Sequence, residues 1–266
     1  MFFYKYQATG NDFIFIDAFD NPDFELSPQD VRFLCDRHFG IGSDGLIILR
    51  PSDDYDFFMD YYNPDGTMAT FCGNGGRASV LFAFERGRTD RQVWFEARDG
   101  IHRAEIKEND VVKLEMKKVR KIKLRDGEYF LNTGTEHTVV FVDDVDKTDV
   151  KKEGRRIRYD AKYAPDGTNV NFVQVIDNSQ IKVRTYEKGV EDETLSCGTG
   201  TVASAIVAEF IGKTSSPVEV VTRGGVLKVY FEKRFERYID VWLEGEAKFV
   251  FSGEIFLPFK EIEKNK

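Results

Sequence analysis

One short motif occurs twice in this chain, and the spacing between its copies restricts the folds that the chain can adopt. Each copy is a cysteine followed by two closely spaced glycines and then by small and apolar residues, CGNGGRASVLFAFERG from Cys72 and CGTGTVASAIVAEFIG from Cys197. Tyr61 and Tyr186 also match, each eleven residues before its cysteine. The offset is 197 − 72 = 125, close to half of the 266 residues. A repeat of this kind predicts two similar α/β domains.

The rest of the chain alternates short β-like runs with turn signals, as in DFIFIDAF and QVWFEARDG. The segment 218–256 is typical of a meander of strands. Ser27 and Pro28 predict the start of a third helix, with Asp30 completing a capping box and Gly40 as the stop.

The limits of the two domains follow from the repeat. We expect the boundary near residue 120, within the basic stretch KKVRKIKLRDG. The N-terminal half, 1–120, then carries Cys72, and the C-terminal half, 121–254, carries Cys197. The tail at about 255–266 is expected to return to the first half.

Composition excludes several classes of function. The net charge of −8 would repel a phosphate backbone, so we expect no nucleic-acid partner. No run approaches the roughly 18 apolar residues of a membrane span, and the start MFFYKYQATGND does not resemble a signal peptide. Three cysteines, 37 and 125 residues apart, are too few and too dispersed for a disulfide framework or a zinc ribbon. We therefore expect a cytoplasmic protein without a metal.

A cysteine at the start of a glycine-rich helix predicts acid–base chemistry. The first turn of a helix offers backbone N–H groups and the positive end of the helix dipole, which together bind a small anion such as an α-carboxylate. The same field lowers the pKa of a thiol. Two such ends would place one carboxylate between two thiols. One thiolate could then remove an α-proton while the other thiol delivers a proton to the opposite face, which inverts the carbon.

Other polar residues have ordinary structural interpretations when each is taken alone. Cys35 lies on the apolar face of its predicted helix and is read as a packing residue. Asn11 and Asn63 have the local composition of turns. His137 begins a predicted strand and Glu187 ends one, where such side chains are usually solvated or locally hydrogen-bonded.

The assembled motifs resemble those of the diaminopimelate epimerase family over nearly the whole chain. They are, in order, GNDF at 10–13, GIGSDGLI at 40–47, NPDG at 63–66, CGNGGR at 72–77, TGTEH at 133–137, GTNVNFV at 167–173, GVEDETLSCGTG at 189–200 and GG at 224–225. The resemblance implies an α/β (α+β) fold of two pseudo-symmetric domains. Each domain would be a mixed or antiparallel sheet wrapped around a central helix, with the active site in the cleft between them. It also implies catalysis without a cofactor.

The resemblance assigns roles residue by residue. Cys72 and Cys197 become the two acid–base thiols, with Cys197 accepting the proton and Cys72 donating one in the LL-to-meso direction. The remaining assignments concern binding and tuning. Gly73, Asn74, Gly198 and Thr199 would bind the reacting carboxylate through backbone amides; Asn11, Asn63 and Asn169 would contact the substrate, the latter two at its distal end; His137 and Glu187 would tune the thiols and position the substrate.

Two segments depart from the family pattern. Lys188 stands where the family commonly has arginine, so a point charge replaces a planar two-pronged donor for the distal carboxylate. Thr135 and Glu136 replace the usual Asn-Pro, and Glu136 would repel an anionic substrate if it faced the cleft. These departures concern substrate choice and leave the proton-transfer residues intact.

Three functions remain open from the sequence. The first is an isomerase that interconverts LL- and meso-diaminopimelate, an intermediate of lysine and peptidoglycan precursor synthesis. The second is a racemase of the same fold, free of pyridoxal phosphate, that acts on another amino acid. The third is a catalytically silent amino-acid-binding protein. In each case the partner is a small amino acid, and a homodimer is an open alternative to a monomer.

Overall fold

The computed structural model describes residues 1–257 and divides the chain into two compact units. The first unit is Met1–Val112 together with the chain from Glu246 onward, and the second is Lys113–Gly245. The chain passes between the units within one strand, β7 (Val111–Glu115), and at the end of another, β16 (Arg237–Glu246). The sequence placed these passages near residues 120 and 255. The part of the expected tail from 258 to 266 lies outside the described residues.

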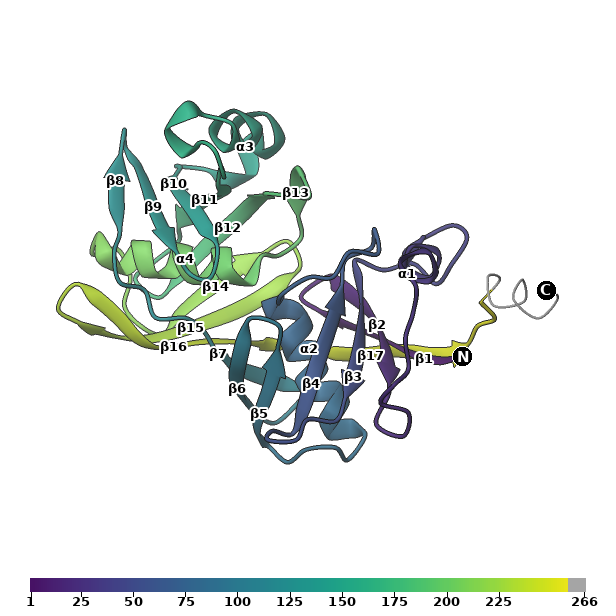
Figure 1. Ribbon diagram of the computed structural model, residues 1–266. Helices are drawn as coiled ribbons and strands as arrows, with labels where there is room; N and C mark the ends of the chain where they lie inside the picture. Colours follow the sequence, from purple (N-terminus) through teal and green to yellow (C-terminus); the bar gives the residue numbers. More distant parts are fainter. Residues whose placement is uncertain (258–266) are drawn as a thin grey trace. The chain divides into compact units, whose positions relative to one another are not determined.

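The first unit is a mixed sheet with one helix at its centre (Figure 1). Its strands pair in the order β17, β1, β2, β3, β4, β5, β6. The helix α2 packs against most of these strands, and α1 covers the opposite face of β3. The elements are β1 (Phe2–Ala8), β2 (Asn11–Asp17), α1 (Pro28–Cys35), β3 (Gly45–Arg50), β4 (Phe57–Tyr62), α2 (Gly73–Glu85), β5 (Gln92–Ala97), β6 (Gly100–Ile106) and β17 (Lys248–Glu254).

The second unit repeats this arrangement around α4 (Figure 1). Its strands pair in the order β8, β9, β10, β11, β12, β14, β15, β16, and β13 also pairs with β12. The elements are β8 (Lys123–Arg125), β9 (Glu128–Asn132), β10 (Glu136–Phe141), η1 (Val145–Lys147), α3 (Val150–Arg158), η2 (Ala161–Tyr163), β11 (Asn169–Val175), β12 (Gln180–Glu187), β13 (Asp192–Thr194), α4 (Gly198–Phe210), β14 (Val218–Thr222) and β15 (Gly225–Arg234).

The two units have the same topology. From β1 to β6 successive pairs are antiparallel, parallel, antiparallel, parallel and antiparallel. The series β9, β10, β11, β12, β14, β15 follows the same order of directions. In each series the fourth strand precedes the helix that begins after a cysteine. The duplication predicted from the sequence is therefore confirmed in the fold.

Alternation along the strands explains how each sheet lies between two helices. Val170 and Phe172 on β11 pack with α3, whereas Asn171 between them faces α4, because successive side chains of a strand point to opposite faces. Nearly all residues of α2 and α4 are buried, as expected for helices that are small and apolar on every side. Among residues 1–257, no helix is long and apolar enough to cross a membrane.

The third helix begins as predicted but ends earlier. Ser27 caps α1 and forms the capping box with Asp30. The helix ends at Cys35 rather than continuing toward Gly40, because the Asp36 carboxylate accepts hydrogen bonds from the backbone N–H groups of the next turn. His38 is therefore exposed and lies outside the helix. Cys35 packs in the core as expected, and burial raises the pKa of its thiol to about 11.

Candidate active site

Cys72 stands at the N-cap of α2, at the position where a helix leaves its first amides without partners inside the helix. Its backbone is extended and its side chain does not cap the helix. The first helical hydrogen bond runs from the Gly76 N–H to the Cys72 carbonyl at 2.7 Å. Cys72 is half-buried, and this helix end carries a thiol and backbone donors together.

Asn11 holds the Cys72 thiol. The thiol donates to Asn11 Oδ1 at 3.7 Å, and Asn74 Nδ2 donates to the same oxygen at 3.3 Å. Asn11 Nδ2 in turn donates to Asp44 Oδ2 at 2.7 Å. Because a carboxylate can only accept, Asp44 fixes which end of the Asn11 amide faces the sulfur. Cys72 therefore meets a hydrogen-bond acceptor, which favours its protonated form.

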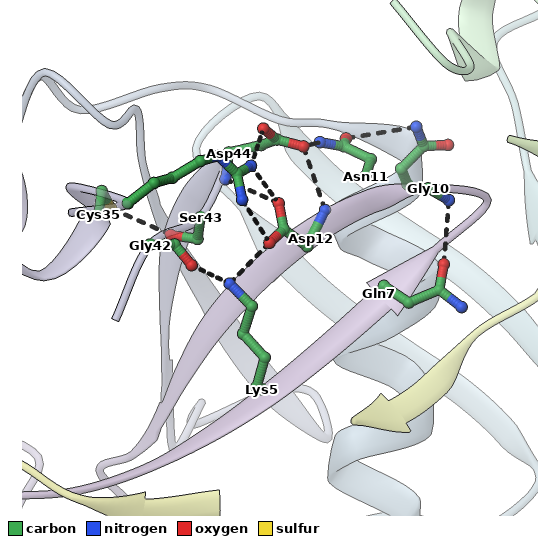
Figure 2. A network of polar contacts seen from close by, with 11 residues as sticks. Lys5, Gln7, Gly10, Asn11, Asp12, Cys35, Gly42, Ser43 and Asp44 are labelled. Carbon is green, nitrogen blue, oxygen red and sulfur yellow. Dashed lines mark hydrogen bonds and ion pairs between the residues drawn. The ribbon is translucent and has the colours of Figure 1, made fainter. Parts of the chain in front are cut away.

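A network of four charged side chains connects to Asn11 through Asp44 (Figure 2). Asp12 lies 2.7 Å from both Lys5 Nζ and Arg37 Nη2, and Arg37 Nη2 also contacts Asp44 Oδ1 at 2.7 Å. Lys5 is buried and also donates to the carbonyl of Gly42. Although burial opposes ionisation of Asp12, hydrogen bonds from Arg37 and Lys5 hold its pKa at about 2. The start of β2 is thus fixed by ionised groups.

Cys197 occupies the equivalent N-cap of α4 and is buried. Its sulfur lies 3.5 Å from Thr199 Oγ1, and this oxygen lies 2.9 Å from His137 Nε2. Burial, with a smaller contribution from the positive charge of Lys188, lowers the pKa of His137 to about 3. His137 is therefore a neutral imidazole at neutral pH, with one nitrogen that donates and one that accepts.

The surrounding hydrogen bonds settle which nitrogen of His137 carries the proton. The Asn171 amide nitrogen donates to the Thr138 carbonyl at 3.1 Å, and a carbonyl can only accept, so this end of the amide also donates to His137 Nδ1 at 3.1 Å. The proton of His137 is then on Nε2, which donates to Thr199. The Thr199 hydroxyl hydrogen is left to point at Cys197. Cys197 therefore meets a donor, which favours its thiolate form.

Sequence and fold comparisons identify the family. The family model described as diaminopimelate epimerase matches residues 3–122 and 129–250. The diaminopimelate epimerase of Flavobacterium psychrophilum is 46% identical over 257 residues, covering 95% of this chain and 99% of that protein. The corresponding protein of Aquifex aeolicus is 43% identical, covering 96% and 98%. The chain belongs to the diaminopimelate epimerase family. Members of this family are isomerases, and this chain is an enzyme of that class.

Solved structures of more distant proteins share the fold. A phenazine biosynthesis protein of the PhzF family from Bacillus anthracis has a TM-score of 0.75 at 17% identity, covering 96% of this chain and 99% of that one. A hydroxyproline epimerase from Agrobacterium vitis has a TM-score of 0.65 at 14% identity, covering 95% and 91%. At these identities the likeness concerns the fold alone.

The two departures from the family pattern lie next to each other in the second unit. Lys188 Nζ contacts Glu136 Oε2 at 3.3 Å, and Asn132 Nδ2 donates to Glu136 Oε1 at 3.1 Å. Asn169 joins the same segment: its oxygen accepts from the Lys188 N–H and its nitrogen donates to the Glu136 carbonyl, both at 2.9 Å. Glu136 is thus paired with a cation, which offsets the charge that was expected to repel an anionic substrate if Glu136 faced the cleft.

The remaining predicted residues keep to their expected elements. Glu187 is the last residue of β12 and directly precedes Lys188. Asn63 follows β4, where its side chain donates to Thr67 Oγ1 at 3.1 Å within its own turn. Within residues 1–257, no group of three or more His, Cys, Asp or Glu side chains is arranged to hold a metal ion.

Sequence reasoning missed the residues that support the site. Asp44, Asn171 and Thr185 were not singled out, although Asp44 orients Asn11. Asn171, which accepts a hydrogen bond from Thr185, orients His137. The available signal was polarity inside buried strands: Asn171 interrupts the apolar run of β11, and a buried amide needs hydrogen-bond partners.

Proposed function

We propose that this protein interconverts LL- and meso-diaminopimelate by two-thiol acid–base catalysis at the α-carbon. The observation that carries the proposal is the opposite hydrogen-bond polarity at two equivalent helix ends. Asn11 offers Cys72 an acceptor, whereas Thr199 offers Cys197 a donor. Membership of the diaminopimelate epimerase family supports the choice of substrate.

The proposed reaction is a proton transfer at each face of one carbon. The Cys197 thiolate removes the α-proton of the LL isomer and becomes a thiol. The Cys72 thiol delivers its proton to the opposite face and becomes a thiolate, so charge and protons balance. Backbone amides at the two helix starts (Gly73, Asn74, Gly198 and Thr199) would bind the carboxylate and stabilise the negative charge that develops on it.

His137 takes the role of a positioning group in this scheme. Its Nε2–H holds the Thr199 oxygen, and this directs the Thr199 hydroxyl at Cys197. Because burial keeps its pKa near 3, the imidazole orients the donor without adding a charge. Asn11 plays the corresponding part at Cys72.

The distal part of the substrate would meet the Lys188–Glu136 pair. The second centre of diaminopimelate carries one ammonium and one carboxylate group. A cation and an anion 3.3 Å apart present the complementary charges, with Asn63, Asn169 and Glu187 as further proposed contacts. This pairing favours a zwitterionic distal group over the single carboxylate of an acidic amino acid.

The chemistry also suggests a location. All three cysteines are free, and the mechanism needs reduced thiols, which a reducing cytoplasm maintains. We therefore propose a cytoplasmic location, and we propose a homodimer as the assembly. Light scattering during size-exclusion chromatography would test the assembly, since a monomer mass would exclude it.

The direct test is incubation of the reduced protein with LL-diaminopimelate, followed by chiral chromatography. The proposal predicts formation of the meso isomer and its loss in both Cys72→Ala and Cys197→Ala, with Cys35→Ala unaffected. Parallel incubations with L-proline, L-glutamate and L-lysine cover a racemase of other specificity. Turnover of one of these amino acids without turnover of diaminopimelate would overturn the assignment of diaminopimelate as the substrate. Tight binding of diaminopimelate without conversion would indicate a binding protein.

A further inference from the structure

Arg77 is a fully buried arginine near the start of α2, and its charge has no carboxylate partner among residues 1–257. Its Nη2 donates to Thr9 Oγ1 at 2.8 Å and to Asn74 Oδ1 at 3.1 Å, and its Nη1 donates to the Gly73 carbonyl at 3.5 Å. All three partners are neutral. Its Nε has no hydrogen-bond partner among the described residues. A buried guanidinium in such surroundings is costly unless an anion comes close.

Other cations pair with four of the carboxylates on the strands around α2. Asp12 is paired with Lys5 and Arg37, Asp17 with Arg86 and Arg88, Asp60 with Arg50 and Arg98, and Glu105 with Lys107. The other titratable groups on these strands and on α2 itself are Tyr4, Tyr6, Tyr61, Tyr62, Glu85, Glu96, His102, Arg103, Lys248 and Glu254. Burial lowers the pKa of Arg77 to about 10, and the charge of Cys72 opposes this change.

The duplicated unit shows that the fold does not require an arginine here. The position equivalent to Arg77 is 77 + 125 = 202, which is Val202 on α4. Val202 is as fully buried as Arg77, and α4 packs inside its sheet in the same topology. A buried charge therefore occurs five residues after Cys72, whereas the equivalent position after Cys197 is apolar.

We propose that Arg77 stabilises the thiolate of Cys72, as a positioning residue that acts through the charge at the start of α2. The inference rests on the proposed function, because each conversion from LL to meso leaves Cys72 deprotonated. In the resting structure the Asn11 oxygen favours the thiol, so the thiolate needs a cation to offset it. In this scheme the Thr199 hydroxyl stabilises the thiolate of Cys197, and the charge of Arg77 stabilises the thiolate of Cys72.

The test measures the thiol pKa of Cys72 from the pH dependence of its alkylation by iodoacetamide, followed on the Cys72 peptide by mass spectrometry. The background is Cys197→Ser, so that the two thiols do not titrate together. Arg77→Met should raise the pKa of Cys72 by at least one unit, which slows alkylation at pH 7 about tenfold. Arg77→Lys keeps the charge and should restore the wild-type value to within a few tenths of a unit.

A matched control and a second variant keep the result interpretable. In the Cys72→Ser background, Arg77→Met should leave the pKa of Cys197 unchanged. Arg77→Gln retains a polar side chain toward Thr9 and Asn74 without the charge, and serves if Arg77→Met does not fold. An unchanged Cys72 pKa in a folded neutral variant, or an equal change at Cys197, would overturn the inference. Alkylation does not involve diaminopimelate, so this result is independent of whether the substrate is correct.

Discussion

At the scale of single residues, the two cysteines differ in what their neighbours can donate. Asp44 turns the oxygen of Asn11 toward Cys72, and Asn171 forces the proton of His137 onto the nitrogen that faces Thr199. The sequence predicted both cysteines and His137, because motifs and helix starts are local. It could not predict the partners of Asn171 or Asp44, because these depend on which strands become neighbours.

Adding a Cβ atom at Gly200 would test this arrangement. A Cβ at Gly200 would lie 2.2 Å from Asn171 Oδ1 and 3.3 Å from His137 Cε1. Gly200→Ala should therefore displace the Asn171–His137 contact, lower the free energy of unfolding by about 1–3 kcal/mol and reduce kcat at least tenfold. Urea denaturation and steady-state kinetics measure both effects.

The equivalent glycine is the matched control for Gly200. A Cβ at Gly75 meets the flexible ends of Met59 and Ile47 at 3.1 and 3.2 Å. Gly75→Ala should be nearly neutral, since these methyl groups can shift and alanine favours a helix. Equal effects of the two substitutions would show that the contacts of Gly200 have no special role.

His137 predicts how stability depends on pH. Its pKa is about 3 in the folded protein and near 6.5 in an unfolded chain, so the unfolded state binds the proton between these values. The free energy of unfolding should consequently fall as the pH drops below about 6.5, by up to about 1.4 kcal/mol per pH unit from this group. His137→Gln should flatten that slope in urea denaturation between pH 5 and 7. The exposed His38→Gln is the control, and a slope unchanged by His137→Gln would contradict the prediction.

At the scale of elements, the start of α2 depends on how β2 and the segment before β3 are held together. Lys5, Asp12 and Arg37 connect β1, β2 and the segment after α1, and Asp44 carries this connection to Asn11. The sequence predicted the starts of α1, α2 and α4 correctly, because caps and glycines are local signals, but it did not predict α3. It extended α1 too far, because the Asp36 carboxylate competes for the backbone N–H groups of the next turn.

Asp44→Asn should uncouple the charge network from the site. The new amide can donate as well as accept, so the Asn11 amide would no longer be held in one orientation. We expect kcat/KM to fall about tenfold, which corresponds to about 1.4 kcal/mol and to one charge-assisted hydrogen bond. Steady-state kinetics with Asp53→Asn, on an exposed residue of the same unit, gives the control. Equal kinetics for the two variants would remove Asp44 from the site.

At the scale of the whole molecule, the chain contains two units of the same topology. The offset of 125 residues predicted this duplication, and the strands of the two units follow the same order of directions. The limits of the units were harder to predict. The chain changes units inside β7 and at the end of β16, which are ordinary strands without the composition of a linker. The duplication gives each unit one cysteine, and the proposed reaction requires one thiol from each.

The measurement that tests this claim most directly is deuterium incorporation during the first turnovers of LL-diaminopimelate in D2O. With two thiols on opposite faces, the abstracted proton stays with Cys197 and the new one comes from a deuterated Cys72. Deuterium should therefore enter the inverted centre of the meso product while the remaining LL substrate stays unlabelled. Equal early labelling of substrate and product would indicate a single base. That result, or full epimerisation by either Cys72→Ala or Cys197→Ala, would contradict the two-thiol account.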